Sequence, residues 1–182
     1  MANKIINLIF LFVISSTVTA DQTNSRLDDM FIQLKSAENI EDAYSIAGGI
    51  WAVWSESNNQ NINKLMEEGK IAIARFDLDT ALAIFDQIIE VKPKFAEGWN
   101  KRATVNYMAG NYIASLADIE KTLKLEPRHF GALAGRGLCY LELEYWQEAL
   151  DSFEAALNIN PWLQGAQQRV EELKHRLNYR SI

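Results

Sequence analysis

Apolar side chains recur at three- and four-residue steps in a succession of short stretches along the chain. One stretch contains Leu133, Leu138 and Leu141, and the next contains Leu150 and Phe153. Such spacing places the apolar residues on one face of a helix, because an α-helix completes a turn in about 3.6 residues. The pattern therefore predicts consecutive amphipathic helices, each with one buried face.

The pattern returns with a fixed period, which the prolines mark. The chain has three prolines, Pro93, Pro127 and Pro161, and the interval from the first to the second equals that from the second to the third. Aligning the sequence with itself at this period superposes small residues on small ones and large apolar residues on large ones. Each unit contains two amphipathic stretches and is therefore predicted to be a helix pair. The coinciding sets are Gly69, Ala103 and Gly137; Ala81, Ser115 and Ala149; and Phe85, Ile119 and Phe153.

The residue types at the repeated positions suit a stack of helix pairs. Small residues on both helices of a unit let the two axes approach closely, and the large residues fill the space beside them. Proline cannot continue the hydrogen-bond ladder of a helix, and it disfavours helical geometry in the residue before it. Each proline therefore ends a second helix where the chain turns into the next unit.

The segment from residue 62 to residue 161 resembles three tandem tetratricopeptide repeats. The last unit keeps the family signature best, the middle unit keeps Trp99 and Ala103, and the first keeps Leu65 and Gly69. The resemblance implies an all-α solenoid of antiparallel helix pairs. In the last unit the signature residues are Gly137, Tyr140, Ala149, Phe153, Ala156 and Pro161.

The flanking segments are predicted to complete this stack. Residues 21–61 contain two further helical stripes and a polar turn, and we interpret them as a divergent fourth helix pair. In its second helix, Gly48 and Gly49 would cost about 1 kcal/mol each unless another backbone packs closely there. Residues 162–182 form a one-sided helix that would cap the last repeat, since that repeat otherwise exposes its apolar face.

The first twenty residues have the organisation of a signal peptide. Lys4 precedes an apolar run of about ten residues, and small residues lead up to Ala20. That run is shorter than the roughly 20 residues that a membrane-spanning helix needs. We therefore expect residues 1–20 to be cleaved, leaving an exported protein, periplasmic or secreted, without a stable membrane anchor.

Composition narrows the possible partners. The formal net charge is −6, which disfavours nucleic acid and anionic membranes, because both are bound chiefly by clustered Lys and Arg. The single cysteine, Cys139, excludes a disulfide framework and a cysteine-based zinc site. A protein or peptide partner is the expected one, and neither a cofactor nor a metal is predicted.

Catalytic patterns are weak. The two histidines, His129 and His175, stand in no metal-ligand or triad spacing, and we expect both on the surface. An envelope-polymer hydrolase stays open as a less favoured alternative, with Asp77, Asp79 and Glu97 as its best carboxylates. The chain is accordingly predicted to be a non-enzymatic adaptor or scaffold.

The resemblance implies a binding surface on the first helices of the units, which line the concave face in this family. An apolar peptide or amphipathic helix would be held there. The alternative is that the N-terminal helix pair or the cap helix of the same chain fills the groove. A clamp for a terminal carboxylate is not expected, since Gly131 and Gly135 occupy clamp positions. The predicted binding residues are Met66, Lys70, Ile73, Asn100, Thr104, Tyr107, Leu138 and Leu141.

Two further surfaces remain as hypotheses. Arg102 and Arg136 lie one repeat period apart, in register with Glu68, so they either fix the stacking through ion pairs or receive an acidic partner. Trp51 and Trp54 are expected to be core residues; if they were exposed, they could support self-assembly into a homo-oligomer.

Overall fold

Helices make up all the regular structure in the part of the chain that the structure describes. The computed structural model describes residues 26–180, and the predicted signal peptide lies outside this range. The predicted all-α class is confirmed. The helices are α1 (Arg26–Lys35), α2 (Ile40–Ser55), α3 (Gln60–Ala74), α4 (Leu78–Val91), α5 (Ala96–Met108), α6 (Tyr112–Leu125), α7 (Phe130–Glu142), α8 (Trp146–Ile159) and α9 (Gln164–Arg180).

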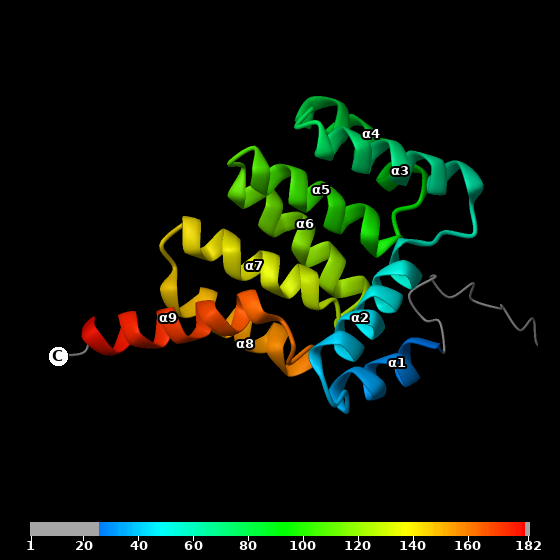
Figure 1. Ribbon diagram of the computed structural model, residues 1–182. Helices are drawn as coiled ribbons and strands as arrows, with labels where there is room; N and C mark the ends of the chain where they lie inside the picture. Colours follow the sequence, from blue (N-terminus) through cyan, green and yellow to red (C-terminus); the bar gives the residue numbers. More distant parts are fainter. Residues whose placement is uncertain (1–25, 181–182) are drawn as a thin grey trace, which may run out of the picture.

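Helices α3 to α8 form three antiparallel pairs that stack side by side. Helices that follow one another in this stack pack against each other (Figure 1). Within the pairs, small residues face aromatic rings. A Cβ atom placed on Gly69 would come within 2.5 Å of the Phe85 ring, and one on Gly137 within 2.8 Å of the Phe153 ring. The close approach of helix axes inferred from the repeated small residues is therefore present in the first and last pairs.

Local signals fix the boundaries of the helices. The side chains of Asn59 and Asp77 accept hydrogen bonds from backbone N–H groups in the first turns of α3 and α4. Each first helix ends in a turn that contains a residue with positive φ, namely Phe76 (62°), Gly110 (76°) and Glu144 (60°). Only the middle unit has glycine at this position, although the left-handed conformation favours glycine there.

Helix α9 covers the end of the stack. It packs against α8 through Ala166, Val170 and Leu173, which are buried, and its opposite face is exposed. The predicted capping helix is thus present. No helix among the described residues is long and apolar enough to cross a membrane.

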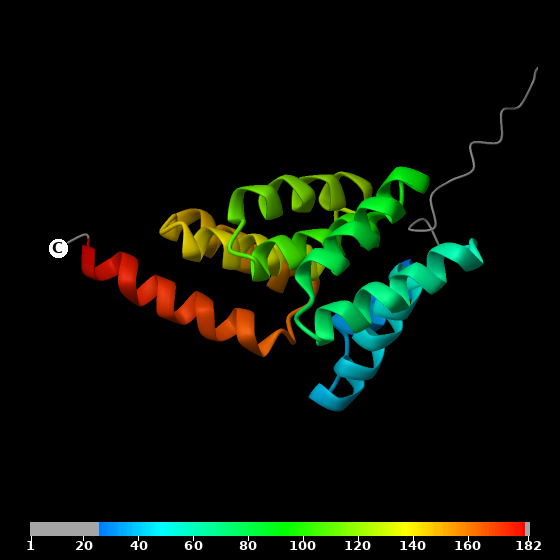
Figure 2. The same ribbon diagram turned by 90° about the horizontal axis from the view of Figure 1, so that it is seen from above.

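The pair α1–α2 does not stack ahead of α3 as a fourth repeat, so that expectation is wrong. Its hydrophobic cluster includes Phe130 of α7, Ile159 of α8 and Trp162, but no residue of α3 or α4. Figure 1 shows α2 running past the beginnings of α5 and α7, and Figure 2 shows the pair and α9 on the same side of the stack. The chain folds back because large aromatic residues of α2 find complementary space at the beginning of α7, as described below.

One of the two mid-helix glycines of α2 is explained by packing. A Cβ atom on Gly49 would lie 2.5 Å from the terminal carbon of Met30 in α1, so a side chain packs closely there in place of the backbone that we expected. Gly48 faces open space, and nothing in the structure explains it.

Candidate functional site

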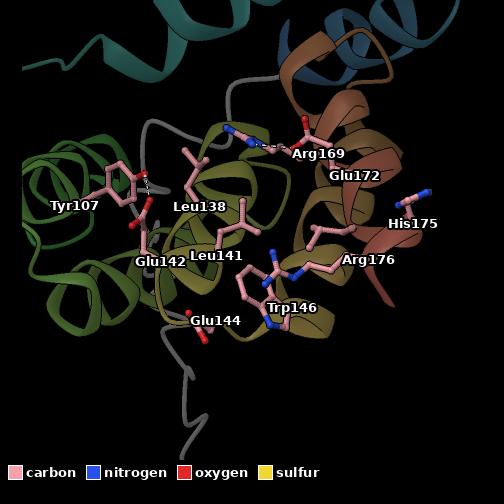
Figure 3. A pocket seen from close by; sticks show the side chains of 11 residues that line it. Tyr107, Leu138, Leu141, Glu142, Glu144, Trp146, Arg169, Glu172, His175 and Arg176 are labelled. Atoms are coloured by element: carbon pink, nitrogen blue, oxygen red, sulfur yellow. Dashed lines mark hydrogen bonds and ion pairs between the residues drawn. The ribbon is translucent and has the colours of Figure 1, made fainter. Parts of the chain in front are cut away.

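An open groove runs between α7 and α9 on the side of the stack that α1 and α2 also border. Its larger part has a volume of about 690 Å³, and a second part of about 540 Å³ continues toward Tyr44 of α2. The two parts meet at Leu138 and Arg169, which line both. The larger part is lined by Tyr107, Leu138, Leu141, Glu142, Glu144, Trp146, Arg169, Glu172, Leu173, His175 and Arg176 (Figure 3).

The floor of the groove is apolar and comes from the first helices of the last two units. Leu138 and Leu141 lie three residues apart on α7, so both point to the same side, and Tyr107 of α5 stands beside them (Figure 3). All three side chains are half-buried. The two leucines pack in part against the core that α8 and α9 share, and their remaining surface is available to a ligand.

The end of α7 carries a carboxylate held by two phenols. The hydroxyl of Tyr107 donates to one oxygen of Glu142 at 3.4 Å, and the hydroxyl of Tyr112 donates to the other at 3.3 Å. Burial first, and the negative charge of Glu142 next, raise the pKa of Tyr107 above its ordinary value. The phenols therefore stay protonated and keep the carboxylate oriented.

The opposite wall belongs to α9. Arg169 forms an ion pair with Glu172 at 2.9 Å, one turn further along the helix. The guanidinium carbon of Arg176 lies 3.7 Å from the centre of the Trp146 ring. This wall therefore carries charged side chains that already have partners, and Trp146 completes the floor beneath it.

A smaller cavity, of about 200 Å³, lies next to the groove between α5 and α7. It brings together four of the predicted binding residues, Asn100, Thr104, Tyr107 and Leu138. The amide of Asn100 is buried and donates to Glu97 at 3.1 Å, so that group is already committed within the chain. Thr104 donates its hydroxyl to the carbonyl of Asn100 at 3.0 Å.

The predicted residues of α3 do not take part in this groove. Met66 is 1% exposed and belongs to the core, so its prediction as a binding residue is wrong. Lys70 pairs with Glu67 at 2.7 Å, and Ile73 packs against the core of the first pair. The open groove therefore lies beside the last two units and α9, away from α3.

The row of arginines has a structural role, but not with the partner that we expected. Glu68 pairs with Lys64 at 3.6 Å. Arg102 instead forms a bidentate pair with Asp118 of α6 and a further pair with Asp86 of α4, each at 2.6 Å at its closest. These bonds, first those to Asp118, raise the pKa of Arg102 above its already high ordinary value.

Arg136 occupies the equivalent position one unit later and is bound more loosely. Its Nε donates to the hydroxyl of Ser152 at 3.0 Å. Ser152 stands one repeat period after Asp118, so a neutral residue replaces the carboxylate that holds Arg102. Arg136 does not line the groove described above.

A buried polar cluster, which the sequence did not reveal, joins α2 to the stack. His129 is fully buried, so its prediction as a surface residue is wrong. Its ring stacks on Trp54, with centroids 4.1 Å apart and planes 12° apart. Its Nε2 lies 3.0 Å from Oε2 of Glu97, which also pairs with Lys101 at 3.1 Å.

The hydrogen bonds define the protonation of this cluster. The backbone N–H of Ala132 donates to Nδ1 of His129 at 3.0 Å, so Nδ1 carries no proton and Nε2 is the donor to Glu97. Burial alone would raise the pKa of Glu97, but the hydrogen bond from His129 and the charge of Lys101 lower it below its ordinary value.

The alignment of the repeats contained a sign that His129 is buried. Phe95 lies one repeat period before His129 and is also fully buried, as the residue just before α5. Gly131 leaves room for the Trp51 ring, because a Cβ atom at Gly131 would lie 2.5 Å from it. Trp54 is 1% exposed, so it is a core residue as predicted and is unavailable for self-assembly.

The candidate catalytic carboxylates have structural roles or lie apart. Glu97 is sealed in the buried cluster, and Asp77 caps α4 by accepting from the N–H of Thr80 at 3.3 Å. Asp79 is exposed in the first turn of α4. Burial raises the pKa of Cys139, which makes its thiol a poor nucleophile. Within residues 26–180, no three His, Cys, Asp or Glu side chains gather as metal ligands would.

A family model and two relatives match the sequence of this chain. The family model described as "Tetratricopeptide repeat" matches residues 130–161. A TPR repeat-containing protein of Rhizobium etli is 38% identical over 165 residues, which cover 91% of this chain and 81% of that protein. A protein SGT1 homolog of Oryza sativa subsp. japonica is 31% identical over 50% of this chain, and the match spans only 24% of that protein.

Solved structures with the same fold are more distant in sequence. The Sgt2 TPR domain from Aspergillus fumigatus superposes with a TM-score of 0.64 at 19% identity, covering 68% of this chain and 83% of that chain. MamA superposes with a TM-score of 0.62 at 16% identity, covering 83% of this chain and 86% of that chain. The first TPR of RPAP3, bound to an HSP90 peptide, gives a TM-score of 0.61 at 18% identity over 63% of this chain and 90% of that chain. Given its repeats, its helix-pair stack and its extensive match to the Rhizobium etli protein, this chain belongs to the tetratricopeptide-repeat family.

Proposed function

We propose that this protein is a non-enzymatic interaction module that holds a peptide or helix of another protein in the groove between α7 and α9. The observation that carries the proposal is the groove itself, which has an apolar floor at Leu138 and Leu141 between two polar walls. Helical walls that are already folded lose little conformational freedom when a ligand enters. The module would therefore act by capture, without covalent chemistry.

Two features support this proposal over a purely structural role. The N-terminal pair and α9 border the groove but leave its larger part, about 690 Å³, open. A distant structural neighbour, the first TPR of RPAP3, is seen with an HSP90 peptide bound, so a stack of this fold can hold a peptide. In this chain the side chains of α5, α7 and α9 would bind the ligand, since Met66 and Lys70 of α3 lie outside the groove.

The test is a capture experiment with the chain from Asp21 to Ile182. The wild type is compared with a Tyr107→Ala, Leu138→Ala double variant, and with Ile113→Ala as a matched control, because Ile113 is an apolar side chain that is 68% exposed on α6. We expect one partner to be retained by the wild type and the control and to be lost from the double variant. Equal capture by all three proteins would refute binding in the groove.

We also propose that the protein acts outside the cytoplasm, on the basis of the signal-like residues 1–20. A periplasmic or secreted adaptor is the outcome that this segment favours. Mass spectrometry of the protein purified from its own cells would test it, with a first residue of Asp21 expected in the exported fraction. A chain that retains residue 1 and stays in the cytoplasmic fraction would contradict export.

A further inference from the structure

The two sides of the groove differ in how their charges are balanced. On the α9 side, Arg169 is paired with Glu172 at 2.9 Å, and Arg176 lies over the Trp146 ring. These cations therefore already have partners within the chain. A ligand that offered only acidic groups would have to compete with those contacts.

On the α7 side, negative charge is left without a cation. Glu142 and Glu144 are exposed, and among the side chains of residues 26–178 no Lys, Arg or His nitrogen lies within ion-pair distance of either carboxylate. The two partners of Glu142 are the hydroxyls of Tyr107 and Tyr112, which orient its carboxylate without neutralising it. This edge of the groove is thus ready to receive a positive charge (Figure 3).

The shape of the groove suits a helix. Along α9 the lining residues Arg169, Leu173 and Arg176 follow each other at steps of four and three, and α7 contributes Leu138 and Leu141 at a step of three. Two walls with helical spacing can interdigitate with the side chains of a third helix. From Gln164 to Arg176 the α9 wall extends for about 18 Å, the length of roughly twelve helical residues.

We propose that the groove binds an amphipathic helix of a partner protein, with the helix's apolar stripe on Leu138 and Leu141 and a Lys or Arg of the helix on Glu142 and Glu144. The inference rests on the proposed function and specifies its partner. Charge complementarity supports it, because the chain has a net charge of −6 and the uncompensated part of the groove is acidic. Such a field would also attract a basic segment over a distance.

The details at Glu142 fit recognition of a cation. The rings of Tyr107 and Tyr112 lie 5.6 Å apart and their hydroxyls both donate to the carboxylate, so an incoming ammonium or guanidinium group would meet an anion that two phenols orient. Burial, then the charge of Glu142, raise the pKa of both phenols, which accords with a negative charge that no internal cation offsets. Holding the carboxylate in place reduces the ordering entropy that binding must overcome.

The experiment compares two synthetic helical peptides with the same leucine stripe, one with lysine and one with glutamate beside the stripe. Fluorescence anisotropy measures their dissociation constants for the full chain, for Glu142→Lys, and for Glu120→Lys as a matched control, since Glu120 is exposed on α6 away from the groove. We expect the wild type and the control to prefer the lysine peptide by about tenfold, and Glu142→Lys to reverse the preference. Leu138→Ala should weaken the binding of both peptides by the same factor.

Several results would overturn the inference. The inference fails if the two peptides bind with equal affinity, or if neither binds. It also fails if Glu120→Lys and Glu142→Lys change the two dissociation constants equally. A dimer in sedimentation experiments, with a second copy of this chain in the groove, would overturn it as well. If a captured partner depends on Leu138 but not on Glu142, the proposed interaction module stands and only the basic helix is refuted.

Discussion

The repeat stack and the N-terminal helix pair are held together by different kinds of contact. In the stack, a glycine of one helix faces an aromatic ring of the next, as Gly137 faces Phe153. In the joint between α2 and the stack, a buried histidine lies between Trp54 and the carboxylate of Glu97. The first contact is present in the first and last units of the repeat, whereas the second occurs once in the described chain.

The two kinds of contact contribute differently: the first stabilises the whole stack, and the second holds α1 and α2 against it. Small-on-large packing depends on volume and tolerates some variation in side-chain chemistry. A buried polar cluster depends on each of its hydrogen bonds, because a donor or acceptor left unpaired in the interior costs about 1–3 kcal/mol. We therefore expect substitutions in the stack to affect the whole fold, and those in the cluster to release α1 and α2 first.

The largest effect is expected from Phe153→Ala. This ring is 2% exposed and fills the space beside Gly137, so its loss leaves a cavity in the last unit. We expect the free energy of unfolding to fall by about 3–5 kcal/mol in chemical denaturation. Val91→Ala, at an exposed position of α4, should change it by less than about 0.5 kcal/mol. If both variants lose a similarly small amount of unfolding free energy, the packing of aromatic rings on small residues is not the source of stability.

His129→Ala tests the joint. It removes the ring stacked on Trp54, the acceptor for the Ala132 N–H, and the donor to Glu97, at an expected cost of about 2–3 kcal/mol. Hydrogen exchange should show faster exchange in α2 than in α8. His129→Phe restores the ring but not the hydrogen bonds, so it should recover only part of the loss. Full recovery would mean that packing alone holds the pair.

The joint should also respond to acid, through Glu97. Its pKa in the folded protein is below the ordinary value of 4.5, so its ionised form contributes stability above that value. This contribution falls as the pH drops from about 4.5 through the lower folded value. The intrinsic tryptophan fluorescence, to which the buried Trp54 contributes, should change in this range if α2 undocks. Glu97→Gln should be less stable at neutral pH and lack this titration; an unchanged acid transition would assign it to other carboxylates.

The smallest effect concerns the turns. Phe76 has a φ of 62° and is 68% exposed, so it bears the cost of a left-handed backbone with little burial in return. Phe76→Gly should raise the free energy of unfolding by about 0.5–1 kcal/mol. The converse change at the equivalent turn, Gly110→Ala, should lower it by a similar amount. If Phe76→Gly destabilises the protein, the exposed ring makes a contact that stabilises the turn.

Much of the fold could be predicted from the sequence, because its determinants are local or periodic. Helical periodicity predicted amphipathic helices in each unit, and the equally spaced prolines predicted where the second helices end. Of the predicted binding residues, Tyr107, Leu138 and Leu141 do line one groove, since register along equivalent helices places them on the same face. These features follow from the spacing of residues within about one repeat.

The position of α1–α2 was decided only by the tertiary structure. Trp54 and His129 are separated by more than two repeat periods in the sequence, and no periodic pattern links them. Whether the pair stacks ahead of α3 or folds back onto α7 depends on the space above Gly131 and on the hydrogen-bonding groups of Glu97 and His129. Local spacing determines which residues form helices and which face of each is apolar. The partner that buries that face is determined by complementary shape and hydrogen bonding between segments that meet only in the folded chain.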